Sequence, residues 1–341
     1  MKKDRTSIYI VAELSANHGG SLEHAAKTIR AAAKAGADAV KLQTYTADTL
    51  TIDCDNEYFR IGGGTAWDGK TLYELYKEAY TPWEWHADLK KIAEECGLDF
   101  FSTPFDETAV DFLEKLGVPC HKVASFELID IPLLRKIGAT KKPVIMSTGM
   151  ASEEGIHEAV DTLRKAGCAD LTLLKCTSSY PAEPKDANLL TIPDMVKKFG
   201  CPVGISDHTM GIAVPVAAVG LGICMIEKHL ILSRADGGPD GSFSLEPAEF
   251  REMVDAVRIA EQALGGICYG GTPAEEKSKV FRRSLFVVKD IKAGELFTKE
   301  NVRSIRPGYG LMPRELNNVL GKAAVCDIAF GAPLKTEMIR N

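Results

Sequence analysis

The sequence has no C-x-x-C pair and no long apolar run. Its nine cysteines are scattered and odd in number, which argues against a disulfide framework. No stretch approaches the roughly 18 consecutive apolar residues that a membrane-spanning helix requires. Met1-Lys-Lys-Asp-Arg5 is not followed by the apolar segment of a signal peptide. These absences predict a cytoplasmic protein with no membrane contact.

Positive charge is also too sparse for a nucleic-acid-binding surface. Lysine and arginine number 41 against 47 acidic residues, for a net charge of -6, and no Lys/Arg run exceeds two residues. Nucleic-acid binding is therefore not expected. A composition of 45% hydrophobic and 26% charged residues is typical of globular proteins. A length of 341 residues suits one large domain and one small one.

One pattern repeats from residue 8 to about residue 263: a short β-branched apolar run, then a longer amphipathic segment. Eight such units predict a (β/α)8 TIM barrel. An open doubly wound sheet is the alternative, but its Gly-rich nucleotide fingerprint is missing after the first run. The predicted strands are Ile8–Ser15, Ala39–Thr44, Asp99–Phe105, His121–Ser125, Pro143–Thr148, Leu171–Thr177, Pro202–His208 and Ile223–Leu230.

The pattern changes after the barrel, predicted over residues 1–264. Residues 265–283 are rich in Gly, Pro and charge, as a linker is. Beyond it, an Asp-Ile-x-x-Gly unit begins at Asp290 and again at Asp327. The repeat predicts a small β-rich domain over residues 284–341. A domain of this size has a thin core, so we expect it to lean on the barrel or on another subunit.

The connection after the second predicted strand, from Tyr45 to about Pro82, is unusually long. It holds five of the nine tyrosines, and all three tryptophans lie in it or just after it. Long connections tend to be functional. A satellite hydrophobic cluster and a lid over a ligand such as a sugar are both compatible with this composition.

Polar residues concentrate at the carboxyl ends of the predicted strands, where TIM-barrel active sites lie. Lys41 and Lys122 sit among apolar strand residues. A lysine inside a barrel costs several kcal/mol unless it is paired or used, so we interpret both as functional, with surface lysines as the alternative. Lys175 and Lys228 are out of phase with their neighbours and are interpreted as solvated or salt-bridged.

Two kinds of ligand suit these strand ends. His208 and His229 end neighbouring strands, where two imidazoles with carboxylate or water oxygens could share Mn²⁺ or another divalent ion. Lysines together with hydroxyl donors suit a small phosphorylated carboxylate. The hydroxyls near these lysines belong to Thr103, Ser125, Ser147, Ser178 and Ser206.

Six motifs at these strand ends resemble the nonulosonic (sialic) acid synthase family. They are Val11-Ala-Glu-Leu-Ser-Ala-Asn-His18, Ala37-Asp-Ala-Val-Lys-Leu-Gln-Thr44, Phe101-Ser-Thr-Pro-Phe-Asp106, Lys122-Val-Ala-Ser125, Ser147-Thr-Gly-Met150 and Ile205-Ser-Asp-His-Thr209. The resemblance covers essentially the whole chain, and the C-terminal part is similar to the family's antifreeze-like (SAF) domain. Trp67-Asp-Gly-Lys-Thr-Leu-Tyr-Glu-Leu-Tyr76 and Thr81-Pro-Trp-Glu-Trp-His86 resemble the branch that makes pseudaminic acid. The branches that make N-acetylneuraminate or legionaminate are the alternative.

The resemblance implies a reaction and a set of site residues. The reaction condenses phosphoenolpyruvate with 2,4-diacetamido-2,4,6-trideoxy-altropyranose and water to give pseudaminic acid and phosphate. His208 and His229 would bind Mn²⁺, or else Mg²⁺ or Co²⁺. The implied phosphoenolpyruvate ligands are Lys41, Thr103, Lys122, Ser125, Ser147, Ser178 and Ser206, although N-acetylneuraminate synthases usually have Asn in place of Ser178. The implied sugar contacts are Glu13, Gln43, Tyr180 and Asp240.

Three carboxylates, Glu13, Glu127 and Glu227, are the implied catalytic residues, the last two as proton-transfer groups. Arg306 matches an arginine that reaches from the small domain into a partner's site, which implies a domain-swapped homodimer. Two other hypotheses stay open from the residues alone. One is a Schiff-base aldolase that uses Lys175 or Lys122, and the other is a non-catalytic carbohydrate-binding protein.

Overall fold

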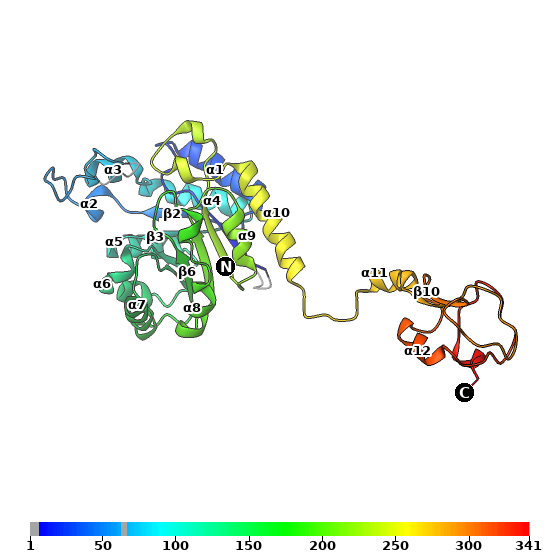
Figure 1. Ribbon diagram of the computed structural model, residues 1–341. Helices are drawn as coiled ribbons and strands as arrows, with labels where there is room; N and C mark the ends of the chain where they lie inside the picture. The colour runs from blue at the N-terminus through cyan, green and yellow to red at the C-terminus, as the bar shows by residue number, and fades with distance from the viewer. Residues whose placement is uncertain (1–6, 63–66, 341) are drawn as a thin grey trace. The chain divides into compact units, whose positions relative to one another are not determined.

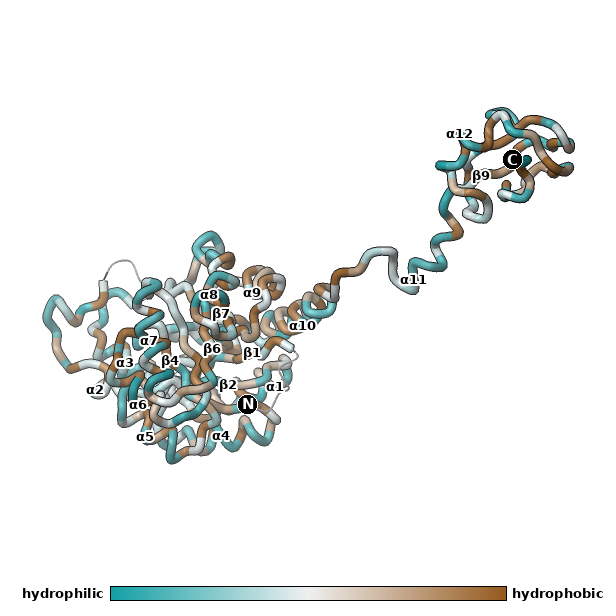
Figure 2. The backbone as a smooth tube through the Cα atoms, turned by 90° about the horizontal axis from the view of Figure 1, so that it is seen from below, coloured by the Kyte–Doolittle hydropathy of each residue, from teal (hydrophilic) through white to brown (hydrophobic). Residues whose placement is uncertain are grey.

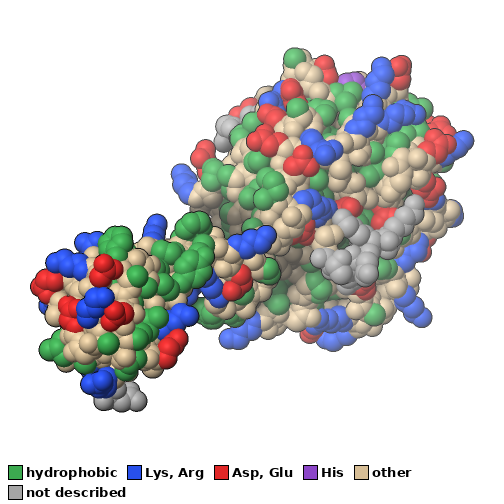
Figure 3. Space-filling view, turned by 90° about the vertical axis from the view of Figure 1, so that its right-hand side faces the viewer, with side chains coloured by type: hydrophobic (Ala, Val, Ile, Leu, Met, Phe, Trp, Pro, Cys, Tyr) green, Lys and Arg blue, Asp and Glu red, His purple; other side chains and the backbone are tan. Residues whose placement is uncertain are grey.

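The computed structural model describes residues 7–62 and 67–340 and divides the chain into two compact units, Met1–Gly265 and Gly266–Asn341. Figure 1 shows the helices and strands of each unit. No helix among the residues described is long and apolar enough to cross a membrane. On the face drawn in Figure 3, basic and acidic side chains are interspersed on both units.

The first unit is a closed barrel of eight strands in sequence order, each parallel to its neighbours, which confirms the predicted TIM barrel. The last strand pairs with the first, so that Glu13 lies beside His229. The strands are β1 (Tyr9–Glu13), β2 (Ala39–Thr44), β3 (Asp99–Pro104), β4 (His121–Val123), β5 (Val144–Ser147), β6 (Leu171–Cys176), β7 (Val203–Asp207) and β8 (Met225–His229).

Helices follow the strands and cover the outside of the barrel (Figure 1). Local sequence sets their ends: Asp106 caps α5 by accepting from the Thr108 and Ala109 amides, and Gly117 ends it at φ 74°. The α-helices are α1 (Leu22–Lys34), α2 (Ala47–Leu50), α3 (Leu72–Ala79), α4 (His86–Glu95), α5 (Glu107–Leu116), α6 (Ile131–Ala139), α7 (Glu153–Ala166), α8 (Thr191–Phe199), α9 (Ala213–Val219) and α10 (Pro247–Leu264). Short 3-10 turns are η1 (Trp83–Trp85), η2 (Glu127–Ile129), η3 (Pro184–Asp186), η4 (Arg234–Asp236) and η5 (Gly241–Phe243).

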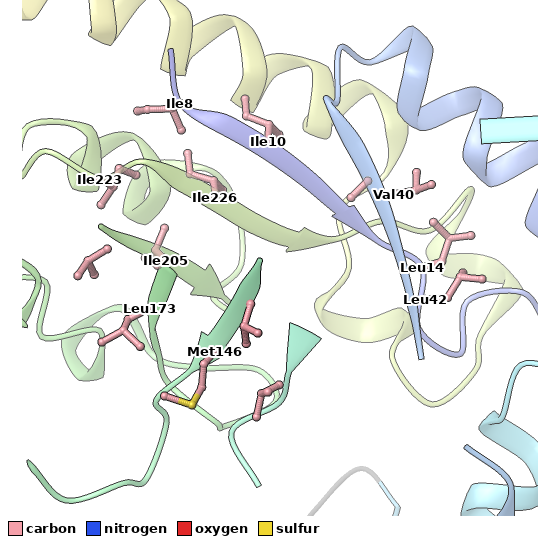
Figure 4. Packing of buried hydrophobic residues seen from close by; sticks show 14 of the residues in the cluster. Ile8, Ile10, Leu14, Val40, Leu42, Met146, Leu173, Ile205, Ile223 and Ile226 are labelled. Atoms are coloured by element: carbon pink, nitrogen blue, oxygen red, sulfur yellow. The ribbon is translucent and has the colours of Figure 1, made fainter. Parts of the chain in front are cut away.

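Successive residues on each strand point to opposite faces, and the two faces have different partners. The outward set packs under the helices in the main core of the unit. Figure 4 shows members of this set, including Ile10, Val40, Met146, Leu173 and Ile205. Figure 2 shows hydrophobic stretches, in brown, among the strands of the barrel.

The inward set forms a second, apolar cluster toward the amino-terminal ends of the strands. We call this part of the interior the lower half of the barrel and the part at the carboxyl ends the upper half. Its buried members are Tyr9, Val11, Ala39, Phe101, Cys120, Ile145, Leu174 and Met225. The space is tight: a Cβ at Gly204 would lie 2.5 Å from the Met225 carbonyl oxygen and 2.8 Å from Leu174 Cδ2. The barrel is therefore a packed core at this level and not a pore.

The long connection after β2 contains two short helices. Its α2 and α3 lie together beside the barrel (Figure 1). Thr46 and Thr71 each form a capping box at the start of these helices. Trp67 Nε1 donates to the Pro239 carbonyl oxygen over 3.0 Å, which ties the segment to the connection after β8.

The second unit has its own small core and little regular structure. Strands β9 (Ser284–Val287) and β10 (Val302–Ile305) pair antiparallel. The two Asp-Ile-x-x-Gly units pair with each other, because the amides of Ile291 and Ile328 each donate to the other's carbonyl, over 2.9 and 2.8 Å. The repeat read from the sequence is thus a structural pair. The remaining elements are α11 (Pro273–Glu276), η6 (Lys277–Phe281), η7 (Pro313–Glu315), α12 (Leu316–Val319) and η8 (Thr336–Met338).

Candidate active site

A cluster of buried charges fills the upper half of the barrel, directly above the apolar cluster. Lys41 Nζ lies 2.6 Å from Glu13 Oε2 and 3.8 Å from Glu227 Oε1. Lys122 Nζ lies 3.9 Å from the same Glu227 oxygen. All four side chains are at most 6% exposed. Two lysines and two carboxylates therefore share one water-poor space, where electrostatic interactions are strong.

Hydroxyl groups line the same space. Ser147 Oγ lies 2.6 Å from Lys122 Nζ, and Ser206 Oγ donates to Glu227 Oε1 over 3.1 Å. Thr103 Oγ1 lies 3.3 Å from Lys41 Nζ. The structure thus brings the Ser147 and Thr103 hydroxyls to the two lysines and the Ser206 hydroxyl to Glu227.

Two further hydroxyls meet around Gly149, a residue to which the sequence assigned no role. The Gly149 amide donates to Ser125 Oγ over 3.1 Å. A Cβ at this position would lie 2.2 Å from Ser178 Oγ and 2.9 Å from Ser125 Oγ. Gly149 is required for this close approach of backbone and hydroxyls, and a cradle in which the Ser125 and Ser178 hydroxyls can donate suits an anion.

The buried charges shift one another's protonation. Burial alone would lower the pKa of Lys41, but the Glu13 and Glu227 carboxylates outweigh it and raise that pKa. Burial lowers the pKa of Lys122, whose carboxylate contact is longer. Burial raises the pKa of Glu13, while the two lysines overcome burial and lower the pKa of Glu227. Of the two lysines, Lys122 is therefore the one whose charged form would be stabilised more by an incoming anion.

His208 and His229 lie beside this cluster, with ring centroids 5.3 Å apart. His208 Nδ1 donates to the Thr177 carbonyl oxygen over 3.1 Å, which leaves its other ring nitrogen as an acceptor. His229 Nδ1 is buried without a hydrogen-bond partner among the residues described, and it lies 3.9 Å from Asp240 Oδ2. An orphaned imidazole nitrogen facing a carboxylate fits a divalent cation, and a backbone-anchored histidine is typical of metal ligands.

A cavity of about 700 Å³ is lined by His229 and Asp240. Gln43 Nε2 donates to Glu13 Oε1 over 3.1 Å and to Ser15 Oγ over 2.8 Å. Tyr180 packs its ring 4.5 Å from the His208 ring. Gln43, Tyr180 and Asp240, three of the predicted sugar contacts, all line this cavity.

Glu127 lines the same cavity from η2, on the side of the long connection. Burial raises its pKa to about 7, and its Oε2 has no hydrogen-bond partner among the described residues. The Tyr76 hydroxyl of α3 is close enough for Glu127 to raise the tyrosine pKa, after the larger effect of burial. A carboxyl group that titrates near neutral pH in a cavity is suited to proton transfer.

Buried anchors behind the site were not assigned from the sequence. Asn17 Nδ2 donates to the Leu230 carbonyl oxygen and to Ser244 Oγ, which fixes the end of β1 against the segment after β8. Lys228, on the helix-facing side of β8, forms a fully buried ion pair with Asp207 of β7. The salt-bridged alternative is therefore the correct one for Lys228. The sequence indicated this through period-two alternation, because Lys228 lies between Glu227 and His229 and so points to the opposite face of the strand.

Two other basic residues that were considered from the sequence, Lys175 and Arg306, lie outside the barrel interior. Lys175 faces the helices and donates to the Cys176 carbonyl oxygen over 3.1 Å. Arg306 belongs to the second unit, directly after β10, and its side chain is exposed there.

A closed (β/α)8 barrel with buried lysines, carboxylates and histidines at the carboxyl ends of its strands has the architecture of a TIM-barrel enzyme. The chain belongs to the NeuB family, whose profile matches residues 28–269, and a SAF domain matches residues 282–340. The SAF match confirms the expected kind of C-terminal domain.

Curated relatives and solved structures extend over most of the chain. Pseudaminic acid synthase from Campylobacter jejuni is 48% identical over 96% of this chain and 95% of its own length. Pseudaminic acid synthase from Helicobacter pylori is 43% identical over 97% of this chain and 98% of its own. A crystal structure of N-acetylneuraminic acid synthetase from Leptospira borgpetersenii, with citrate, aligns with a TM-score of 0.71 and 33% identity, over 80% of this chain and 90% of that one.

Proposed function

We propose that this enzyme condenses phosphoenolpyruvate with 2,4-diacetamido-2,4,6-trideoxy-altropyranose and water to form pseudaminic acid and phosphate. The observation that carries the reaction class is the pair of buried lysines, Lys41 and Lys122, surrounded by hydroxyl donors at the strand ends. The choice of sugar rests on the 43–48% identity to pseudaminic acid synthases over nearly the full chains.

Phosphoenolpyruvate is an anion with a carboxylate and a phosphate, and the barrel offers two matching groups of donors. Lys122 and Ser147, with Lys41 and Thr103 opposite, provide charge and hydrogen bonds within one buried space. The hydroxyls of Ser125 and Ser178 provide a second group of donors, with Ser125 held in place by the Gly149 amide. Held between the two, the substrate keeps its reactive C3 facing the cavity that holds the sugar.

His208 and His229 would hold a divalent ion, Mn²⁺ in the first instance and Mg²⁺ or Co²⁺ otherwise. Within residues 7–62 and 67–340, no group of three or more His, Cys, Asp or Glu side chains could hold a metal by itself. Water and substrate oxygens would therefore complete the coordination. When bound, the ion supplies Lewis-acid polarisation of the sugar aldehyde.

The residues of the chain orient the reactants and move protons. C3 of phosphoenolpyruvate forms a bond to the aldehyde carbon, whose oxygen takes up a proton and becomes a hydroxyl. Water adds at C2 and loses one proton. The bond from C2 to the phosphate oxygen then breaks, the C2 hydroxyl becomes the keto group, and phosphate leaves with the bridging oxygen and the second proton. Lys41 and Lys122 stabilise the charge on the departing group.

Two carboxylates handle the protons, and a third holds neighbouring side chains in place. Glu127, with a pKa of about 7, can give a proton from its unpartnered oxygen to the aldehyde oxygen. Glu227, kept ionised by the lysines, can accept the proton that the attacking water loses. Glu13 holds Gln43 and Lys41 in place and faces the sugar side of the site.

A domain-swapped homodimer in the cytoplasm completes the proposal. Apolar side chains are exposed on the connections after β4, β5 and β7, namely Ile129, Met150 and Met210, and beside Arg306 in the second unit, namely Tyr309. Such surfaces suit the docking of a partner's SAF domain, whose Arg306 would then reach the sugar. Mixing Arg306→Ala with His208→Ala subunits should restore part of the activity. If the subunits exchange and none returns, each site is built within one chain.

The reaction is tested by phosphate release from phosphoenolpyruvate with a panel of amino sugars. We expect release with the 2,4-diacetamido-2,4,6-trideoxy-altrose sugar and much less with N-acetylmannosamine or the corresponding mannose-configured diacetamido sugar. Release with one of the latter sugars instead would assign the enzyme to a sister reaction. Sugar binding without any phosphate release would contradict the synthase assignment.

A further inference from the structure

The cavity at the barrel mouth has two chemically different sides. Its inner side carries the polar groups Ser15, Gln43, His229 and Asp240. Its outer side is lined by a set of aliphatic side chains that all come from the connection between β2 and α4. We call this set the apolar wall, and it consists of Leu50, Ile61, Leu72, Leu75 and Ala79.

The apolar wall is held in a defined position. The amides of Ile61 and Gly69 pair with the carbonyls of Lys70 and Ile61, and the Leu72 amide donates to the Phe59 carbonyl over 2.8 Å. At the far end of α3, His18 Nε2 lies 3.3 Å from the Ala79 carbonyl oxygen. The wall is therefore fixed to the end of β1 as well as within its own segment.

Aromatic contacts join the apolar wall to the barrel. The Tyr45 ring packs edge-on against Tyr76 of α3 at 5.7 Å and against Phe105 at 5.1 Å. Tyr45 directly follows β2, so this ring links the wall to the strand that carries Lys41 and Gln43. The wall and the polar groups thus belong to one cavity with fixed sides.

Leu75 lies in α3, between Leu72 and Ala79 of the apolar wall. It is 7% exposed, yet it lies outside the hydrophobic core clusters formed by the residues described. A ligand that carries only hydroxyl groups would lose hydration against such a surface and gain no hydrogen bonds. A ligand with methyl or acyl groups would gain from burying them there.

We propose that the apolar wall is a subsite for the apolar substituents that the sugar carries far from its aldehyde carbon, at C4 and C6. The inference rests on the proposed function, because it is the aldehyde that must face His229 and the phosphoenolpyruvate donors. With the aldehyde on the polar side, the 4-acyl methyl and the C6 methyl meet Leu75 and its neighbours. Leu75 is thereby a specificity-determining residue.

The test compares two sugars of the same configuration in wild type, Leu75→Ala and Leu113→Ala. One sugar carries the 4-acetamido group and the 6-deoxy carbon, and the other carries hydroxyls at both positions. Leu113 is a matched control, because it is a fully buried leucine of α5 that does not line the cavity. Binding is measured by calorimetry without and with phosphoenolpyruvate, and phosphate release is measured in parallel.

We expect wild type to prefer the acylated deoxy sugar by about tenfold or more, since one methylene in an apolar pocket gives 10- to 200-fold discrimination. Leu75→Ala should lose most of this preference and should accept a 4-butanamido sugar better than wild type does, because the substitution opens space. Leu113→Ala should keep the wild-type preference even where it lowers stability.

The outcomes separate this proposal from the proposed reaction. If wild type binds both sugars equally, or if Leu75→Ala keeps the wild-type preference, the subsite is wrong, whether or not phosphate is released. If the preference is present and depends on Leu75 but no phosphate is released with any sugar, the subsite stands and the synthase reaction falls.

Discussion

The lower and upper halves of the barrel interior are built on the same eight strands and have opposite chemistry. Below, Val11, Phe101, Ile145 and Leu174 pack against one another with at most 1% exposure. In the upper half, the inward positions that come two or more residues later on these strands are polar. They include Glu13, Thr103 and Ser147. On β1, β3 and β5 the change from apolar to polar occurs between one inward residue and the next.

The difference teaches what each half contributes. Burial of the lower side chains follows the hydrophobic effect and stabilises the fold. Burial of the upper charges opposes it, since a buried ion pair often stabilises less than apolar residues of the same volume. The unfavourable burial of charges is confined to the half that faces the cavity, as expected where charged groups bind a ligand. Substitutions in the two halves should therefore have opposite effects on stability and on activity.

The largest effect on activity is expected at the histidine pair. His208→Ala and His229→Ala should each abolish phosphate release and weaken Mn²⁺ binding, measured by calorimetry, while the thermal transition changes little. His157→Ala is the control, because this histidine is exposed on α7. Full wild-type activity in excess chelator would refute a role for a metal here.

The largest effect on stability is expected in the lower half. Leu174→Ala should lower the free energy of unfolding by about 2–5 kcal/mol, because it leaves a cavity in a fully packed interior. Michaelis constants for both substrates should stay near the wild-type values. Denaturant titration and steady-state kinetics on the same preparation check both parts, and a normal unfolding midpoint would show that the lower interior is not closely packed.

Lys122→Met should have the opposite pattern, weakening substrate binding without lowering the free energy of unfolding. Affinity for phosphoenolpyruvate should fall by about 1.5–3 kcal/mol, the contribution of a hydrogen bond to a charged group. The free energy of unfolding should stay the same or rise, because burial lowers the pKa of this lysine and a neutral side chain removes that cost. Unchanged affinity in calorimetry would remove Lys122 from the substrate site.

The smallest effect concerns pH. The Glu127 pKa is raised to about 7 by burial, so the folded state binds more protons than the unfolded state between about pH 4.5 and 7. Wild-type stability should therefore fall as pH rises through this window, by on the order of 1 kcal/mol after solvent screening. Glu127→Gln should lack this component, whereas Glu158→Gln, at an exposed position, should retain it. Equal pH profiles of stability in wild type and Glu127→Gln would contradict the assignment.

The sequence was sufficient for the barrel, its strand order and the residues that gather at the strand ends. Period-two alternation separates inward from outward positions, so Lys41 and Glu227 could be placed inside from their own strands. The sequence therefore predicted which polar residues gather in the upper half, while the chemical roles of these residues stay predictions.

Contacts that depend on how the barrel closes could not be read from single strands. The Gly149 cradle exists because two connections approach within van der Waals distance. The Lys228 and Asp207 pair requires β7 and β8 to be in register. The apolar wall depends on the fold of a long connection whose sequence was compatible with either a cluster or a lid. These are tertiary features, and local patterns do not encode them.

The central claim is that the upper half of the barrel joins phosphoenolpyruvate to a sugar aldehyde with cleavage of the carbon–oxygen bond at C2. Phosphoenolpyruvate with ¹⁸O in the bridging oxygen tests it directly, with the released phosphate followed by ³¹P NMR. The account predicts that all phosphate released in the presence of the 2,4-diacetamido-2,4,6-trideoxy sugar keeps the label. Unlabelled phosphate would mean that the phosphorus–oxygen bond breaks instead, and it would contradict the proposed reaction.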